Sequence, residues 1–201
     1  MDSKQKILNA ALNEFACEGF GGARMDKIAK QAGVNKAMIF YYFSSKELLY
    51  KSLLKDVMVN IFGPMSQLLA AETDANRFLE KIPALQINFF AKNLDFVRIV
   101  TLDLIRNPDN IKEFFKEFFG ERYEKGPGKL LEKVAAWYED GHITEKDPLH
   151  FMINIMSLNI FAFIGRPLFE AVFNAQIEDD DAFCKERIKS VTNLLKQGML
   201  K

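Results

Sequence analysis

Residues 32–49, AGVNKAMIFYYFSSKELL, constrain the fold of this chain more than any other stretch. Five large apolar or aromatic residues stand in a row at positions 39–43, and a run of this kind suggests a buried strand. The flanking segments, however, are typical of helices: residues 32–34 form an Ala-Gly-Val turn, and residues 44–47 fit a capping box. If the run is helical, about half of its rings must face away from the core.

The rest of the chain repeats its apolar residues at helical period. In the first segment Ser3 is a candidate cap, a stripe of apolar residues follows, and Gly19, Gly21 and Gly22 end the helix. Glycine and proline positions then predict helices at about residues 25–31, 36–43, 46–62, 65–71, 75–92, 95–106, 109–124, 128–140, 147–164, 167–175 and 181–198. No segment shows the two-residue period of a strand, so the predicted fold class is all-α.

Local signals fix the predicted ends of the early helices. Gly33 suits the left-handed position after the second helix, and Asn35 can cap the third. Ser44 is predicted to cap the next helix with Glu47 three residues on, and Gly63-Pro64 is predicted to stop that helix.

Two short helices joined by a tight turn indicate a helix-turn-helix. Ile39 and Phe43 lie four residues apart and therefore share one helix face, which can pack on the preceding helices. Six residues then remain at the periphery or outside: Lys36, Ala37, Met38, Phe40, Tyr41 and Tyr42. Such an exposed cluster calls for a partner that covers it.

The composition of this cluster suits DNA. Lys36 can meet a phosphate or a guanine edge, Ala37 permits close approach, and Met38 can contact a thymine methyl group. Tyrosine hydroxyls can bond phosphate oxygens, and Lys46 lies in a first helical turn, where backbone N–H groups attract phosphate.

These residues resemble the DNA-binding domain of the tetracycline-repressor (TetR) family of bacterial transcriptional regulators. The resemblance covers residues 5–55 and rests on Ile-Ala at 28–29, Ala-Gly-Val at 32–34, Ile-Phe-Tyr-Tyr-Phe at 39–43 and Lys-Glu-Leu-Leu at 46–49. It implies a three-helix DNA-binding domain at residues 1–46, followed by a helical effector-binding and dimerisation domain at 47–201. The candidate DNA contacts are Arg24, Asn35, Lys36, Ala37, Met38, Phe40, Tyr41, Tyr42 and Lys46.

Two positions depart from the family pattern. The family usually places a threonine near the start of its second helix, where this chain has Ala23-Arg24-Met25, so Arg24 is expected to supply a contact instead. Phe40 replaces the usual tyrosine, and its ring either contacts DNA or turns inward.

The body of the chain is unusually aromatic, and ordinary core packing accounts for most of its rings. Because the family binds small effectors, a subset is expected to line a pocket for a largely apolar, aromatic-tolerant effector. The candidate effector-binding residues are Phe89, Phe96, Arg98, Asp103, Phe115, Trp137, Met152 and Met156. The family further implies a homodimer through the last two long helices, and the nearly all-round apolar residues 151–165 agree with it.

Charge and cysteine content set wider bounds. The net charge is zero, yet residues 1–60 carry nine Lys or Arg against six Asp or Glu. Cys17 and Cys184 form no CxxC pair, and no apolar run reaches membrane-spanning length, so a cytoplasmic protein is expected. No metal site and no cofactor are predicted.

The predicted function is that of a DNA-binding transcriptional regulator, most simply a repressor released from a palindromic operator by its effector. The alternatives are an activator of the same fold and a helical protein whose aromatic patch meets another protein. A helical enzyme is not expected, because the sequence has no nucleophile-base motif and no phosphate-binding glycine loop.

Overall fold

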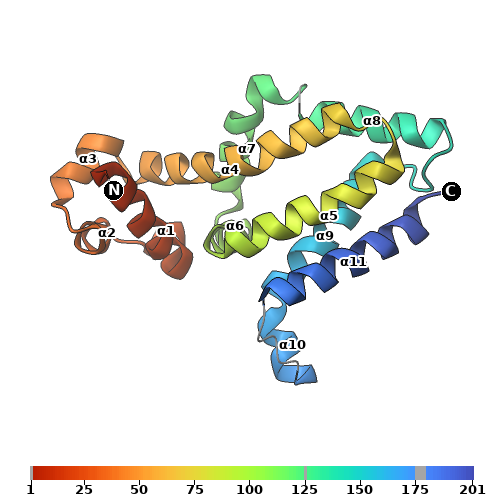
Figure 1. Ribbon diagram of the computed structural model, residues 1–201. Helices are drawn as coiled ribbons and strands as arrows, with labels where there is room; N and C mark the ends of the chain where they lie inside the picture. The colour runs from red at the N-terminus through yellow and green to blue at the C-terminus, as the bar shows by residue number, and fades with distance from the viewer. Residues whose placement is uncertain (1, 125, 175–179) are drawn as a thin grey trace. The chain divides into compact units, whose positions relative to one another are not determined.

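The computed structural model describes residues 2–124, 126–174 and 180–201 and confirms the all-α fold (Figure 1). Its helices are α1 (Ser3–Gly22), α2 (Met25–Ala32), α3 (Lys36–Phe43), α4 (Lys46–Ala71), α5 (Ala75–Lys92), α6 (Leu94–Arg106), α7 (Pro108–Phe119), η1 (Gly120–Arg122), α8 (Pro127–Glu139), α9 (Pro148–Ile164), α10 (Arg166–Phe173) and α11 (Asp180–Met199). Within the described residues, the only strand-like pairing is an isolated bridge between Ile143 and Leu200.

Packing divides the chain into two units. Unit 1 comprises Met1–Asn60 and Asn93–Phe118, and unit 2 comprises Ile61–Lys92 and Phe119–Lys201. The helix-turn-helix helices α1, α2 and α3 therefore share a unit with α6 and with most of α7. The predicted boundary after residue 46 falls at the start of α4, and as a division of function it stays a prediction.

Unit 1 is built on the buried face of α3. Ile39 is fully buried and Phe43 is nearly so, whereas the other six residues of α3 are exposed or intermediate. Phe15 of α1 and Ile28 of α2 are also fully buried. The spacing of four residues between Ile39 and Phe43 thus fixes which side of α3 meets the domain core, as predicted.

Two predicted helix ends in unit 1 are confirmed by the backbone. Gly33 follows α2 in the left-handed region with φ 66°, where glycine has no steric penalty. Gly19 interrupts α1 with φ 70° and ψ 174°, a conformation that is essentially restricted to glycine. The helix is kinked at Gly19 and ends at Gly22.

A buried hydrogen bond joins α4 to α6 inside unit 1. The Tyr50 hydroxyl donates to the carboxylate of Asp103, and Asp103 is fully buried. The ring of Tyr50 also lies 5.0 Å from the rings of Phe15 and Phe20 on α1. Burial, followed by the hydrogen bond to Asp103, raises the pKa of the Tyr50 hydroxyl above its usual range, so this hydroxyl remains a proton donor.

Two predictions about α4 are wrong. Ser44 does not cap this helix: its φ of 62° ends α3, and the Ser45 hydroxyl instead accepts the backbone N–H of Leu48 at 3.1 Å. The helix also does not stop at Gly63-Pro64 but continues to Ala71, so the predicted helix at 65–71 is its last part. Proline removes one backbone donor, and both Gly63 and Pro64 lie on an exposed stretch where water can satisfy the freed carbonyl.

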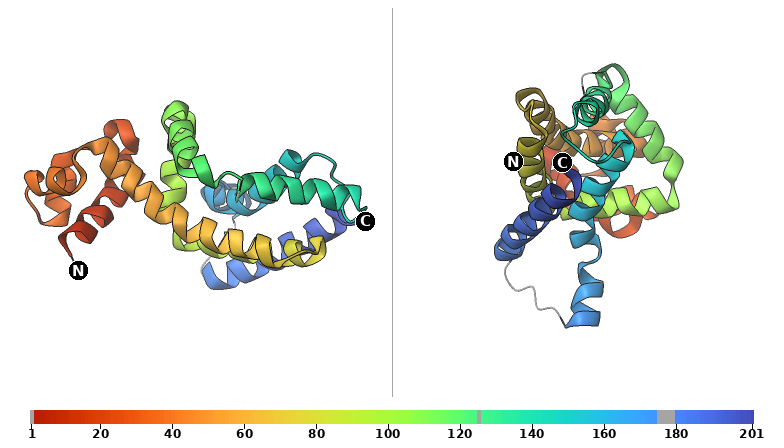
Figure 2. Two further views of the ribbon diagram at one scale, coloured as in Figure 1. Left: turned by 90° about the horizontal axis from the view of Figure 1, so that it is seen from above. Right: turned by 90° about the vertical axis from the view of Figure 1, so that its right-hand side faces the viewer.

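Unit 2 is a bundle in which α5 packs against both α9 and α11, and α8 packs against α9 (Figure 2). Trp137 of α8 lies at its centre, 5.3 Å from the ring of Phe78 and 6.4 Å from that of Phe151. Its indole N–H donates to the Thr73 carbonyl at 2.8 Å, which satisfies the polar atom of an otherwise apolar side chain.

The helix α9 is buried on one face rather than on several. Its buried residues are Phe151, Ile155, Asn159 and Ala162, a single stripe at helical spacing. Five large apolar residues of the same helix are exposed: Leu149, Ile153, Met156, Phe161 and Ile164. A protein rarely leaves so continuous an apolar face uncovered, and among the described residues nothing covers this face of α9.

Among the described helices, none alone meets the length and hydropathy needed to cross a membrane. The pair α9 and α10 passes that test together, with a bend of 63° at Gly165.

We predict that Tyr50→Phe destabilises the protein by about 2–4 kcal/mol, because it leaves the buried Asp103 carboxylate with only the long hydrogen bond from the Asn107 side chain at 3.4 Å. Thermal and urea unfolding followed by circular dichroism would measure the loss. The double variant Tyr50→Phe/Asp103→Leu removes both polar groups and should recover most of the stability. A single variant as stable as wild type would show that the hydrogen bond does not hold α4 to α6.

Candidate DNA-binding surface

The start of α3 is set by its cap. The Asn35 side-chain oxygen accepts the backbone N–H of Met38 at 2.8 Å, as predicted for an N-cap residue. This bond places Lys36 and Ala37 in the first turn, where both are exposed. The first turn of α3 therefore presents small and basic side chains to solvent.

The aromatic run 39–43 separates into a buried and an exposed set. Tyr41 is 82% exposed, Phe40 42% and Tyr42 38%. The rings of Tyr41 and Tyr42 meet edge to face with their centroids 5.3 Å apart. Phe40, whose direction the sequence left open, points outward with the tyrosines, and we therefore name Phe40, Tyr41 and Tyr42 the aromatic face of α3.

Three basic side chains stand at the starts of α2, α3 and α4. Lys36 hydrogen-bonds to Asp26 of α2 at 3.0 Å, and both groups are exposed. The ammonium of Lys46 lies 5.0 Å from the centroid of the Phe20 ring, which positions it at the start of α4. Arg24 is exposed at the N-cap of α2. An anion reaching Lys36 must compete with Asp26.

The start of α2 has a cap that sequence reasoning missed. Glu14 of α1 is buried, and its carboxylate accepts the backbone N–H of Arg24 at 3.0 Å. This contact satisfies a free donor at the beginning of α2, where the family threonine is absent. Lys27 lies 3.8 Å from the same carboxylate and bonds Glu18 at 2.9 Å; this bond raises the pKa of Lys27 and lowers that of Glu18.

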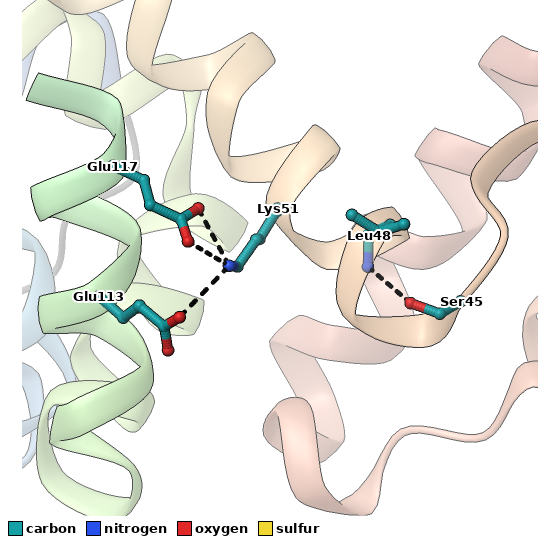
Figure 3. A network of polar contacts seen from close by, with 5 residues as sticks. All are labelled: Ser45, Leu48, Lys51, Glu113 and Glu117. Carbon is teal, nitrogen blue, oxygen red and sulfur yellow. Dashed lines mark hydrogen bonds and ion pairs between the residues drawn. The ribbon is translucent and has the colours of Figure 1, made fainter. Parts of the chain in front are cut away.

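The first turns of α4 are fixed by the network in Figure 3. Ser45 caps the helix through Leu48, and Lys51 bonds both carboxylate oxygens of Glu117 at 2.8 and 3.0 Å, with Glu113 at 3.8 Å. The hydrogen bond to Glu117 raises the pKa of Lys51. Because Lys51 is paired with carboxylates of α7, Lys46 is the lysine in the first two turns of α4 that is available to bind an anion such as a phosphate.

The eight candidate effector residues fall into both units. Phe89, Trp137, Met152 and Met156 belong to unit 2, and Phe96, Arg98, Asp103 and Phe115 belong to unit 1. Several have structural contacts of their own. Asp103 accepts from Tyr50, Trp137 donates to Thr73, and the exposed Arg98 pairs with Asp95 at 2.9 Å. Met156 is 41% exposed on the open face of α9.

The pairing of two sets of polar residues in the interior could not be predicted from the local sequence. Tyr50 and Asp103 stand 53 residues apart, and Gln86 and Asn159 stand 73 apart. In each case a polar residue occupies an otherwise apolar helical stripe, and this interruption was the one sign that could have pointed to them.

The comparisons with known proteins agree with this geometry. The family model described as bacterial regulatory proteins, tetR family, matches residues 7–53, which contain α2, α3 and most of α1. Over residues 7–53 the chain is therefore similar to the TetR family. The matched residues hold the cap at Asn35, the turn at Gly33 and the aromatic face, so the family match and the exposed surface coincide.

Relatives extend the similarity beyond residues 7–53. The HTH-type transcriptional regulator RutR of Escherichia coli (strain K12) is 25% identical over 98% of this chain and 90% of its own length. The HTH-type transcriptional repressor NicS of Pseudomonas putida is 31% identical over 50% of this chain and 48% of its own. The crystal structure of the transcriptional regulator FadR from Bacillus subtilis in complex with stearoyl-CoA matches with a TM-score of 0.67 at 21% identity, covering 94% and 97% of the two chains.

We predict that Asp26→Asn strengthens duplex DNA binding by about two- to fivefold at low salt, because it removes the carboxylate that competes for Lys36. Fluorescence anisotropy with a labelled duplex would measure the gain. In the double variant Lys36→Ala/Asp26→Asn most of this gain should vanish. An equal gain with and without Lys36 would show that Asp26 acts only through long-range charge.

Proposed function

We propose that this TetR-family regulator is a homodimeric repressor that leaves its operator when a small, largely apolar effector binds. The observation that carries the proposal is the aromatic face of α3. An exposed helix beside basic side chains has the shape and chemistry of a recognition helix for the major groove.

Each residue of the proposed DNA-binding surface has a proposed role at the DNA. The hydroxyls of Tyr41 and Tyr42 bond phosphate oxygens, and the Phe40 ring contacts a sugar or a thymine methyl group. Lys36 and Met38 read base edges, while Ala37 lets the helix approach. Arg24 and Lys46 meet phosphates on either side, and Asn35 holds the first turn of α3 in place.

The second copy in the proposed dimer covers the exposed face of α9. Four residues of that face recur along the helix, namely Leu149, Ile153, Met156 and Ile164, and Leu194 of α11 is 54% exposed. A two-fold dimer presents two recognition helices to successive major grooves, so the operator is palindromic.

The proposed division of labour assigns residues 1–46 to the operator and residues 47–201 to the effector and the dimer. The aromatic interior of unit 2, with Trp137 between Phe78 and Phe151, supports an apolar ligand. The structural relative FadR is described in complex with stearoyl-CoA, an acyl ligand that agrees with this choice.

Release requires that the effector bind two states of the protein with different affinity. The helix α4 begins in unit 1 and ends in unit 2, so it is the segment through which a change in the body can reach the start of the DNA-binding surface. Tyr50 and Lys51 of α4 hold α6 and α7 within unit 1, so a displacement of α4 would alter these contacts.

We predict that Tyr42→Ala and Lys46→Ala each weaken binding to an operator obtained by genomic selection by about tenfold. Each side chain supplies one or more contacts to the DNA backbone, and Lys46→Ala should also reduce the salt slope by about one. Tyr123→Ala, at an exposed tyrosine of unit 2, is the matched control and should bind like wild type. Failure of the wild-type protein to select any duplex would overturn the proposed function.

We predict that Ile153→Asp or Met156→Asp converts the dimer to a monomer, because a charge on the α9 face would be buried without a partner. Light scattering coupled to size-exclusion chromatography would give the mass. Leu104→Asp, at an exposed leucine of α6, is the control and should leave the dimer intact. If both variants remain dimeric, the dimer interface does not include this face of α9.

A further inference from the structure

Two amide side chains are buried together inside unit 2. Gln86 of α5 and Asn159 of α9 are both completely inaccessible to solvent. The Asn159 amide N–H donates to the Gln86 side-chain oxygen at 2.6 Å. These residues stand 73 positions apart, and the packing of α5 on α9 brings them together.

One half of each amide has no partner among the described residues. The Gln86 amide nitrogen and the Asn159 side-chain oxygen are buried and make no hydrogen bond. Turning both amides over exchanges these roles but still leaves one N–H donor group and one oxygen acceptor free. Buried polar groups in native proteins are almost always paired, so this donor and acceptor call for a partner that the described residues do not supply.

Apolar layers lie on both sides of the pair along the two helices. One turn earlier stand Ile82 and Ile155, both fully buried in the core of unit 2. One turn later stand Phe90 and Phe163, whose ring centroids are 6.1 Å apart. Phe163 is only half-buried. The Gln86–Asn159 pair therefore lies nearer the surface on the side of the Phe90–Phe163 layer.

The unpaired donor of Gln86 and the unpaired acceptor of Asn159 determine which chemical groups can bind to both. A neutral amide, or a carboxylic acid in its undissociated form, presents a donor next to an acceptor and can satisfy both free groups. A carboxylate has acceptors only. Arg187 of α11 is the cation seen beside this segment of α9: its guanidinium donates to the Leu158 carbonyl at 2.7 Å and, among the described residues, makes no hydrogen bond to either amide. The apolar layers favour an apolar remainder of the molecule.

We infer that Gln86 and Asn159 form the subsite of unit 2 that recognises the polar end of the effector, and that this end is an uncharged group with a donor beside an acceptor, as in a carboxamide. The inference rests on the proposed function and restricts the chemical class of its effector. The rest of the effector lies against the aromatic layer of Phe90 and Phe163.

Three probes of equal chain length test this subsite: octanamide, methyl octanoate and sodium octanoate. Methyl octanoate keeps the acceptor but lacks the donor, and it would leave the Asn159 oxygen unpaired. We expect wild-type protein to bind octanamide at least tenfold more tightly than the ester in calorimetric titration. If octanoate binds more tightly than octanamide, and if its affinity increases as the pH falls toward the pKa of octanoic acid, the polar end of the effector is an undissociated carboxylic acid.

The decisive variant is Gln86→Leu/Asn159→Leu, which removes both polar groups at similar volume. Replacing both partners of a buried pair costs little stability, so the variant should melt at or above the wild-type temperature. Its preference for the amide should vanish. Gln197→Leu, at an exposed glutamine of α11, is the matched control and should keep the preference. If the double variant does not fold, the shift of the Gln86 side-chain amide signal on adding octanamide to labelled wild-type protein tests the same contact.

Three results would overturn the inference: no binding of octanamide or octanoate by wild type, equal binding of amide and ester, or an amide preference that survives the double variant. Operator binding is measured separately. A protein that selects an operator but shows any of these results retains the proposed function and loses this subsite. A protein that prefers the amide through Gln86 and Asn159 but selects no operator retains the subsite and loses the proposed function.

Discussion

Tyr50 is the residue on which the order of unit 1 depends. Its ring packs against Phe15 and Phe20 of α1, and its hydroxyl donates to the buried carboxylate of Asp103 on α6. A carboxylate without water is costly unless it is hydrogen-bonded, so this contact fixes the position of α6 against the helix-turn-helix. One side chain of α4 thereby connects three helices, including the first helix of the DNA-binding domain.

The same logic explains how the recognition helix acquires its exposed rings. Ile39 and Phe43 bury one face of α3, and the helical period then turns Tyr41 and Tyr42 away from the core, with Phe40 exposed beside them. Caps set both ends of this arrangement: Asn35 starts α3, and Ser45 starts α4 immediately after it. The DNA-binding surface is thus a consequence of core packing combined with two side-chain hydrogen bonds.

Polar groups in the two units are satisfied to different extents. In unit 1 the buried Glu14 and Asp103 each have a protein partner, whereas in unit 2 the amides of Gln86 and Asn159 satisfy each other only by half. A fully paired interior suits a domain whose shape must stay constant at the DNA. A half-paired interior suits a body that binds a small molecule.

Local sequence determined the all-α class, the helix-turn-helix, and the separation of α3 into buried and exposed rings, since these follow from helical period, glycine at Gly33 and the cap at Asn35. It misplaced the cap of α4 by one residue and ended that helix at Gly63-Pro64, because two adjacent serines compete as caps and because an exposed helix tolerates proline. Only the tertiary structure decided which way Phe40 points, what replaces the missing cap of α2, and which polar residues meet in the interior. Those outcomes depend on contacts between residues 10 to 73 positions apart, which no local pattern encodes.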